Sequence, residues 1–180
     1  MTGAAIRIRR ARQSDDEALT DVLLDCVEGG ASVSFMSPLP REKALAFWQS
    51  VLAAAERGER VVLVAEEGAD PVAATGGEVI GTVQVVLSTP DNQPHRGDVA
   101  KMLVHRRARR RGVGARLMRA AEESAREAGR TLLVLDTVTG GDAERLYAGL
   151  GWQRVGVIPG YALFPEGGLC DTTVFYRLLG

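Results

Sequence analysis

The chain has 180 residues, of which 46% are hydrophobic and 25% are charged. This length fits a single domain with a real core, and the composition excludes a disordered chain. The formal net charge of -1 gives no overall field for holding nucleic acid or an anionic membrane. Positive charge is nevertheless concentrated between Lys101 and Arg119, and this segment needs its own explanation.

The sequence has no stretch that resembles a signal peptide or a membrane span. Ile and Arg alternate near the N-terminus, and no later window approaches the length of a spanning helix. We therefore expect a cytoplasmic protein. Cys26 and Cys170 are too few for a disulfide framework, so they fit a reducing compartment as ordinary small side chains, although one bridge between them stays open.

The first half of the chain predicts one strand, two helices and two further strands. A Ser-x-x-Glu sequence at 14–17 has the form of a capping box, which satisfies backbone N–H groups where a helix begins. Gly29 and Gly58 supply the two helix ends. The predicted boundaries are a strand at 6–10, helices from 14 to 28 and from about 41 to 57, and strands at 61–65 and 79–87. The residues expected on the buried helix stripes are Leu19, Val22, Leu23, Cys26, Val27, Leu45, Trp48, Leu52 and Ala55.

Three connections are predicted as loops. They are a surface loop at 32–37, a long hairpin connection at 68–77 and a polar, proline-containing loop at 88–96. The second half then alternates strands with helices. Its predicted elements are a strand at 98–104, a helix from 113 to about 128, a strand at 132–135, a short helix at 143–150, and strands at 152–157 and 172–178.

This order of elements predicts the fold class. One strand, two helices, three strands, a helix, a strand, a helix and two strands fit a single α/β domain over residues 1–180. We expect a mixed central sheet of about seven strands, covered on both faces by about four helices, with right-handed crossovers.

The segment from Arg109 to Ala115 has the strongest chemical signal. It places Gly112-x-Gly114 between a strand and a helix. Glycines let the backbone approach a ligand closely, and the unpaired N–H groups at a helix N-terminus attract phosphate oxygens. The pattern therefore predicts a diphosphate site, with glycine packing and a solvated arginine surface as the alternative. The segment lacks the Gly-Lys-Ser/Thr ending of an ATP-binding P-loop and the third glycine of a dinucleotide fingerprint.

Arg109-x-x-Gly112-x-Gly114 resembles the pyrophosphate motif Arg/Gln-x-x-Gly-x-Gly/Ala of the GNAT superfamily of N-acetyltransferases. The segment 143–152 resembles that superfamily's second signature, a helix with Leu-Tyr followed by Gly and an aromatic residue. The element order is also the one that the superfamily shows. Within it, residues 135–137, 146–147 and 158–163 are similar to the tabtoxin resistance acetyltransferases.

The resemblance implies an enzyme that transfers the acetyl group of its co-substrate acetyl-CoA directly to an amine in a ternary complex. The backbone of Met102, Leu103 and Val104 would pair with the pantetheine arm. The residues implied in pyrophosphate binding are Arg109, Arg110, Arg111, Gly112, Val113, Gly114 and Ala115. Gly140 stands where the family often has Asn, so one polar contact to the pantetheine arm would be missing or supplied by backbone.

Acetyl transfer to an amine requires two groups that handle protons, because the amine must be neutral and the departing thiolate needs a proton. The resemblance assigns the proton donor to Tyr147, which could instead be a core tyrosine of its helix. Asp136 either binds or deprotonates the amine, or caps the following turn. The weaker candidates for a base are His95, His105, Glu78 and Asp98. No metal site is expected, since two isolated histidines have no ligand spacing.

The acceptor pocket is predicted to contain Phe35, Met36, Asp136 and Tyr161, although Phe35 and Met36 could fill the core, as expected for Trp48. A small-molecule amine is the favoured acceptor, as in detoxification of a toxin or antibiotic. The same fold would support acetylation of protein N-termini or lysines. A nucleic-acid-binding module using 106–111 is disfavoured, because no aromatic residues are interleaved with the arginines. We expect a monomer or homodimer without nucleic-acid or membrane partners.

Overall fold

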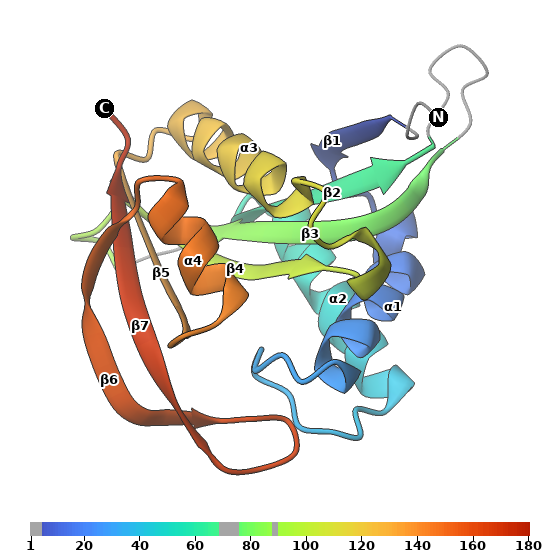
Figure 1. The fold of residues 1–180 in the computed structure, drawn as a ribbon. Coiled ribbons are helices and arrows are strands. Elements are labelled where there is room, and N and C mark those ends of the chain that lie inside the picture. Colours follow the sequence, from blue (N-terminus) through green and yellow to red (C-terminus); the bar gives the residue numbers. More distant parts are fainter. Residues whose placement is uncertain (1–4, 69–75, 88–89) are drawn as a thin grey trace.

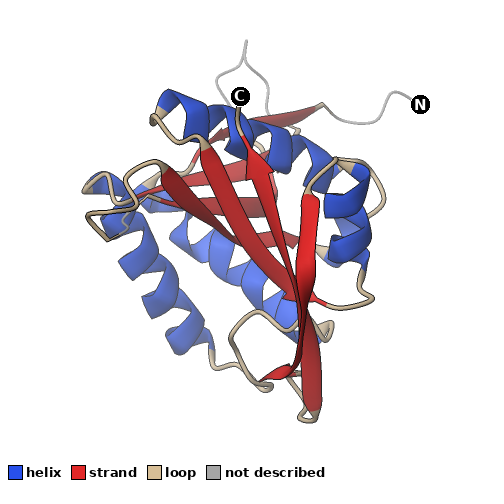
Figure 2. Ribbon diagram, turned by 90° about the vertical axis from the view of Figure 1, so that its left-hand side faces the viewer, coloured by secondary structure: helices blue, strands red, loops and turns tan. Residues whose placement is uncertain are grey.

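The computed structural model describes residues 5–68, 76–87 and 90–180. Most of the predicted hairpin connection at 68–77, the start of the predicted loop at 88–96 and the first four residues lie outside these ranges. The described chain forms three layers, with a twisted sheet between two groups of helices (Figures 1 and 2). Within these ranges, no helix is both long and apolar enough to cross a membrane.

The predicted α/β class and mixed sheet are confirmed. The strands are β1 (Ile6–Arg10), β2 (Arg60–Glu67), β3 (Glu78–Val86), β4 (Arg96–Val104), β5 (Leu132–Val138), β6 (Gln153–Leu163) and β7 (Leu169–Leu178). The α-helices are α1 (Asp16–Glu28), α2 (Arg41–Glu56), α3 (Val113–Glu127) and α4 (Asp142–Gly149). Two short 3-10 turns precede α1 and α3, namely η1 (Gln13–Asp15) and η2 (Arg106–Ala108).

The sheet has the strand order β1-β2-β3-β4-β5-β7-β6. All neighbours pair antiparallel except β4 and β5, which are parallel. Their pairing is short, because it joins 96–98 only to 132–134. Both strands continue beyond that point, β4 to Val104 and β5 to Val138. The sheet therefore divides between its fourth and fifth strands.

Each face of the sheet is covered by its own helices. In β2, Val61 and Leu63 belong to the core under α3, whereas Val62 and Val64 belong to the core under α1 and α2. A strand buried on both faces reads as a continuous apolar run instead of an alternation, which explains the sequence of this strand. Trp48 belongs to α2 and is fully buried, as predicted.

The predicted capping box at Ser14 is wrong. Asp15 takes the N-cap position of α1, and its side chain makes no capping bond to that helix. Its carboxylate instead accepts hydrogen bonds from the Arg12 backbone N–H at 2.6 Å and from the Arg9 guanidinium at 2.7 Å. Since Arg9 comes from β1, this arrangement depends on a tertiary contact that the local sequence pattern does not contain.

The last two strands are longer than the sequence predicted. The strand predicted at 152–157 extends to Leu163 as β6, and β7 begins at Leu169 instead of 172. Pro159 and Gly160 suggested a break, and they fall within an irregularity of strand register between Ile158 and Ala162. Gly160 has a φ of 58°, and β6 continues past this irregularity because it pairs with β7 on both sides of it.

Candidate active site

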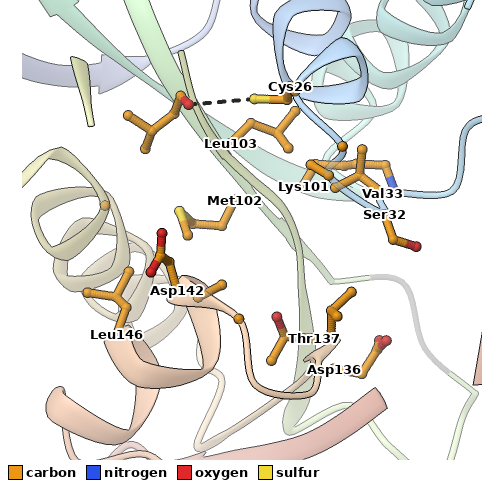
Figure 3. A pocket seen from close by; sticks show the side chains of 18 of the residues that line it. Cys26, Ser32, Val33, Lys101, Met102, Leu103, Asp136, Thr137, Asp142 and Leu146 are labelled. Atoms are coloured by element: carbon orange, nitrogen blue, oxygen red, sulfur yellow. Dashed lines mark hydrogen bonds between the residues drawn. The ribbon is translucent and has the colours of Figure 1, made fainter. Parts of the chain in front are cut away.

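A cleft of about 1020 Å³ opens where β4 and β5 separate. Its lining includes β4 from Val99 to Val104, the turn that leads into α3, and the first residues of α4 (Figure 3). The loop between α1 and α2 and the end of β6 complete it, with residues 29–36 and 161–164. Segments far apart in the sequence thus share one cavity.

A β-bulge shapes the β4 wall of this cleft. Thr82 of β3 pairs with Leu103, whereas Gln84 pairs with Ala100, so two residues of β4 face one residue of β3. The two residues of β4 that oppose Val83 are Lys101 and Met102, and Lys101 has a φ of 49°. Bulges redirect side chains and are common beside functional sites. Both residues line the cleft, and sequence analysis had not selected Lys101.

The turn before α3 presents a series of unpaired backbone donors. The N–H groups of residues 110–115 donate to no acceptor within the described ranges. The first hydrogen bond of the helix runs from the Arg116 N–H to the Gly112 carbonyl at 3.1 Å. Gly112 has a φ of 76°, and a Cβ added there would meet no atom within 4 Å. Left-handed backbone, open space and unpaired amides fit a phosphate group.

The second glycine of the motif has a different role. A Cβ added at Gly114 would lie 3.0 Å from Leu146 Cδ2, so the close approach of α3 and α4 depends on this glycine. The ligand-binding and packing interpretations of Gly-x-Gly thus apply to different glycines. Gly112 leaves space for a ligand, and Gly114 allows the two helices to pack. Val113 and Ala115 also line the cleft.

The three arginines of the motif point to different places. Arg109 lines the cleft, and its Nε donates a hydrogen bond to the Val104 carbonyl at 3.3 Å. Arg110 also lines the cleft and has a φ of 60°. Arg111 is not among the lining residues, because its guanidinium pairs with Glu67 of β2. The structure therefore separates the Arg111 side chain from the other residues predicted to hold pyrophosphate.

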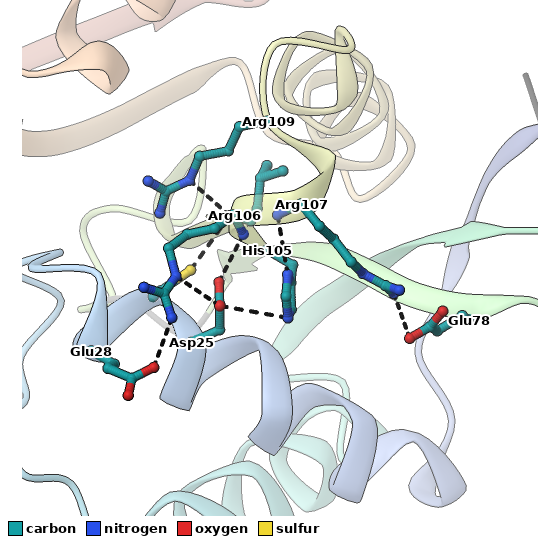
Figure 4. A network of polar contacts seen from close by, with 9 residues as sticks. Asp25, Glu28, Glu78, His105, Arg106, Arg107 and Arg109 are labelled. Carbon is teal, nitrogen blue, oxygen red and sulfur yellow. Dashed lines mark hydrogen bonds and ion pairs between the residues drawn. The ribbon is translucent and has the colours of Figure 1, made fainter.

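The neighbouring arginines are held by carboxylates, as Figure 4 shows. Arg106 contacts Asp25 at 2.8 Å and Glu28 at 2.7 Å, and Arg107 contacts Glu78 at 2.5 Å. Burial would raise the pKa of Asp25, but its hydrogen bonds from Arg106 lower it below the ordinary value. These pairs neutralise much of the basic segment, which argues against the nucleic-acid interpretation.

Tyr147 of α4 is buried and also lines the cleft. Its side chain is 5% exposed, and its ring packs 6.1 Å from the rings of both Trp152 and Phe175. Burial, and secondarily the charge of Asp136, raise the pKa of the phenol. The hydroxyl group therefore stays protonated at neutral pH and can donate a proton. The core position and the donor role, predicted as alternatives, are compatible.

Asp136 lies in β5 beyond the last residue that pairs with β4. It is exposed to the cleft, and Thr172 Oγ1 donates a hydrogen bond to its carboxylate at 3.1 Å. Within the described residues, no backbone N–H donates to Asp136, so the predicted turn cap is not formed. This leaves the carboxylate facing a cavity in which it can attract a cation.

The weaker base candidates do not line the cleft. His95 is exposed at the far end of β4, and Asp98 pairs with its neighbour Arg96 at 3.1 Å. Glu78 is held by an arginine, as described above, and His105 Nδ1 accepts from a backbone N–H at 3.3 Å. In the ranges that the structure describes, no cluster of metal-ligating residues is found.

The predicted acceptor residues all line the cleft. Phe35 also packs edge-to-face on Phe47 at 5.2 Å, so it belongs to both the core and the cavity. Met36 and Tyr161 are 47% and 56% exposed. Sequence analysis missed that Cys26 and Cys170, both free thiols, lie at the cleft as well.

Gly140 does not replace the missing family asparagine. Its N–H donates to the Glu144 carboxylate, which also accepts from Thr173 Oγ1 at 2.8 Å. These hydrogen bonds, that of Gly140 first, lower the pKa of Glu144. Because its amide is occupied and Gly140 does not line the cleft, the residue instead anchors the start of α4.

The structure thus combines a divided mixed sheet, an amide-lined turn before α3 and a cavity beside that turn. Residues 31–152 match the acetyltransferase (GNAT) family. The chain therefore belongs to this family, whose members use acetyl-CoA.

Solved structures share the fold over 96–98% of this chain. The yncA protein of Salmonella typhimurium, solved with its cofactor acetyl-CoA, is 23% identical with a TM-score of 0.78, covering 98% of this chain and 95% of that one. A ribosomal-protein-alanine N-acetyltransferase from Brucella melitensis is 23% identical with a TM-score of 0.78, covering 96% and 99%. A GCN5-related N-acetyltransferase from Kribbella flavida is 24% identical with a TM-score of 0.78, covering 97% and 98%.

Proposed function

We propose that this acetyltransferase is an N-acetyltransferase that transfers acetyl from acetyl-CoA to an amine of a small molecule by direct attack in a ternary complex. The observation that carries the proposal is the cleft of about 1020 Å³. It connects the amide-lined turn at 110–115 with a protonated phenol, Tyr147, and a carboxylate, Asp136. Binding and proton transfer can therefore take place in one continuous cavity.

The chain supplies two binding surfaces for the co-substrate. The unpaired amides of residues 110–115 would hold the pyrophosphate, supported by Arg109 and Arg110. On the side of β4 that faces β5, no described residue pairs with the strand beyond Asp98. Met102, Leu103 and Val104 would offer their backbone there to the pantetheine amides, as to an added strand. When bound, acetyl-CoA supplies the activated thioester.

The protein's own groups would handle the two protons of the reaction. The neutral amine nitrogen attacks the thioester carbonyl carbon, the carbon–sulfur bond breaks, and Tyr147 gives its phenolic proton to the departing thiolate. Asp136 attracts the ammonium form of the acceptor and accepts the proton that the nitrogen loses. The raised pKa of Tyr147 keeps this donor loaded before each turnover.

The lining of the cleft supports a small acceptor. The loop at 29–36 and the segment 161–164 bring apolar side chains, Phe35 and Tyr161 among them, against the cavity. The resemblance to tabtoxin resistance acetyltransferases adds detoxification of a toxin or antibiotic to the proposal. Acetylation of a protein N-terminus is the second candidate, since a ribosomal-protein-alanine N-acetyltransferase shares the fold.

Calorimetric titration with acetyl-CoA tests the binding half of the proposal. Gly112→Asp places a carboxylate in the open space before the amide turn and should abolish binding. Gly58→Asp is the matched control, because Gly58 also has a φ of 76° and open space around its Cβ but lies at the end of α2. Equal affinity in the two variants would refute the diphosphate site.

Thiol release tests the chemical half. Tyr147→Phe should keep the acetyl-CoA dissociation constant and lower kcat by roughly a hundredfold or more, the usual contribution of a general acid. Tyr176→Phe, in β7 and outside the cleft lining, should leave kcat unchanged. The acceptor panel contains small amines, amino acids and peptides. Turnover of peptides alone would favour the protein-acceptor candidate.

A further inference from the structure

Three cationic side chains line the cleft, namely Lys101, Arg109 and Arg110, and within the described residues none of them has a carboxylate partner. Arg109 and Arg110 belong to the amide-lined turn, whereas Lys101 belongs to β4. Lys101 extends from the β4 bulge into the cavity, where its Nζ donates to Ser34 Oγ at 3.1 Å and lies 5.7 Å from the centre of the Phe47 ring (Figure 3). Among the described residues, no carboxylate oxygen lies within 4.0 Å of this ammonium group. By contrast, Arg107 and Arg111 at the nearby turn each have such a partner.

An unpaired cation in a partly enclosed site is energetically unfavourable. Charged lysines are rarely buried without an opposite charge, because the ammonium loses hydration. Burial accordingly lowers the pKa of Lys101. The charge of Asp136 opposes this effect and that of Arg60 adds to it. An anion beside the ammonium would relieve this cost.

The backbone at Lys101 points to the same conclusion. A non-glycine residue with a φ of 49° is uncommon and costs conformational energy. The bulge that requires this conformation also directs the side chain into the cleft. Backbone strain in a β-strand is usually retained where a side chain must be placed for function.

We propose that Lys101 binds a carboxylate of the acceptor, so that the acceptor is an amino acid or another small amine with a carboxylate group. This proposal rests on the function proposed for the cleft. Lys101 and Asp136 then form a complementary pair of sites, in which the ammonium of Lys101 holds the acceptor carboxylate and the carboxylate of Asp136 holds the acceptor amine. The Ser34 hydroxyl, which already accepts from Lys101, has a proton to donate to the same anion.

Matched acceptors measure this role directly. Each amino acid that is turned over is compared with its decarboxylated amine, in the wild type and in Lys101→Met. The variant should lose roughly tenfold to a hundredfold in kcat/KM for the amino acid, mainly through KM, as expected when a charged hydrogen bond is lost. The decarboxylated amine should change less than about twofold. Lys101→Arg should retain part of the preference.

Two controls accompany these variants. Lys43→Met removes the other lysine of the chain, which is exposed on α2, and should change neither acceptor. The acetyl-CoA dissociation constant should be the same in wild type and Lys101→Met. An equal loss of kcat for both acceptors, with loss of the pH dependence of kcat, would overturn the proposal and identify Lys101 as the general base.

A binding measurement separates this proposal from the proposed function. N-acetyl-L-amino acids and the matching N-alkylacetamides are titrated into the CoA complex, which requires no turnover. The N-acetyl amino acids should bind at least about tenfold more tightly to wild type, and Lys101→Met should remove that difference. Equal affinity for the two series in wild type would overturn the carboxylate site. Failure of every amine as an acceptor would instead refute the proposed function.

Discussion

Arg9 of β1 bridges two buried carboxylates, and its removal should strongly destabilise the fold. Its guanidinium contacts Asp15 and Glu66 at 2.7 Å each, and the three side chains are 13%, 9% and 3% exposed. Arg9→Met keeps much of the side-chain volume but removes the closest cation from both carboxylates, which leaves Asp15 with the Arg12 backbone N–H and Glu66 with Arg7 at 3.9 Å. Breaking a buried ion pair costs about 3–5 kcal/mol. Because Arg9 keeps some exposure to water, we expect about 2–4 kcal/mol.

Urea unfolding at pH 7, followed by circular dichroism, measures this loss. With a slope of about 2 kcal/mol per molar urea, the midpoint should fall by about 1–2 M. Arg41→Met is the matched control, since Arg41 also bridges two carboxylates, Glu17 and Asp21, at 2.6 Å each, but is 48% exposed. Its midpoint should not change. Adding Glu66→Gln to Arg9→Met should recover part of the loss, because one buried charge disappears. Equal midpoints for the two single variants would refute the reasoning.

Three further predictions concern the same fold. Hydrogen bonds from two arginines lower the pKa of Asp15 below its ordinary 3.8 despite its burial, so its contribution to stability is complete above that value and is lost as the pH falls through the folded pKa. Asp15→Asn should therefore flatten the decline of unfolding free energy in urea titrations between about pH 5 and pH 2. In Gly81→Ala, the new Cβ would lie 2.9 Å from the Leu103 carbonyl oxygen, so β4 must shift. Thermal denaturation should show a loss of about 1–3 kcal/mol in the free energy of unfolding, and calorimetry should show weaker binding of acetyl-CoA. Trp152→Phe removes the 3.0 Å hydrogen bond to buried Glu122 and should cost about 1–3 kcal/mol in urea unfolding, whereas an unchanged midpoint would show that water replaces the indole.

Much of the fold follows from local patterns in the sequence. The α3 stripe of Val113, Leu117, Ala121 and Ala125 is buried as its spacing indicates, because helical periodicity alone decides which side chains share a face. Pro159, within β6, shows where such patterns end. Its strand extends through a residue that disfavours strands, since the pairing with β7 offsets the local cost.

The candidate site divides in the same way. The motif around Gly112 could be predicted because a left-handed turn before a helix favours glycine. The first backbone N–H groups of any helix also lack partners within that helix. The environment of Asp136 could not be predicted, since the hydroxyl that holds it comes from Thr172 on another strand. Long-range pairing and the register of neighbouring strands decide such contacts.

The sequence by itself therefore determined the class of fold, the family and the position of the glycine turn before α3, all of which depend on short-range patterns. Only the tertiary structure decided which charges remain unpaired beside that turn. Arg106, Arg107 and Arg111 belong to the basic segment that was prominent in the sequence, and each pairs with a carboxylate from another element. Lys101, inconspicuous in the sequence, extends into the cleft because an irregular pairing of β4 with β3 redirects it.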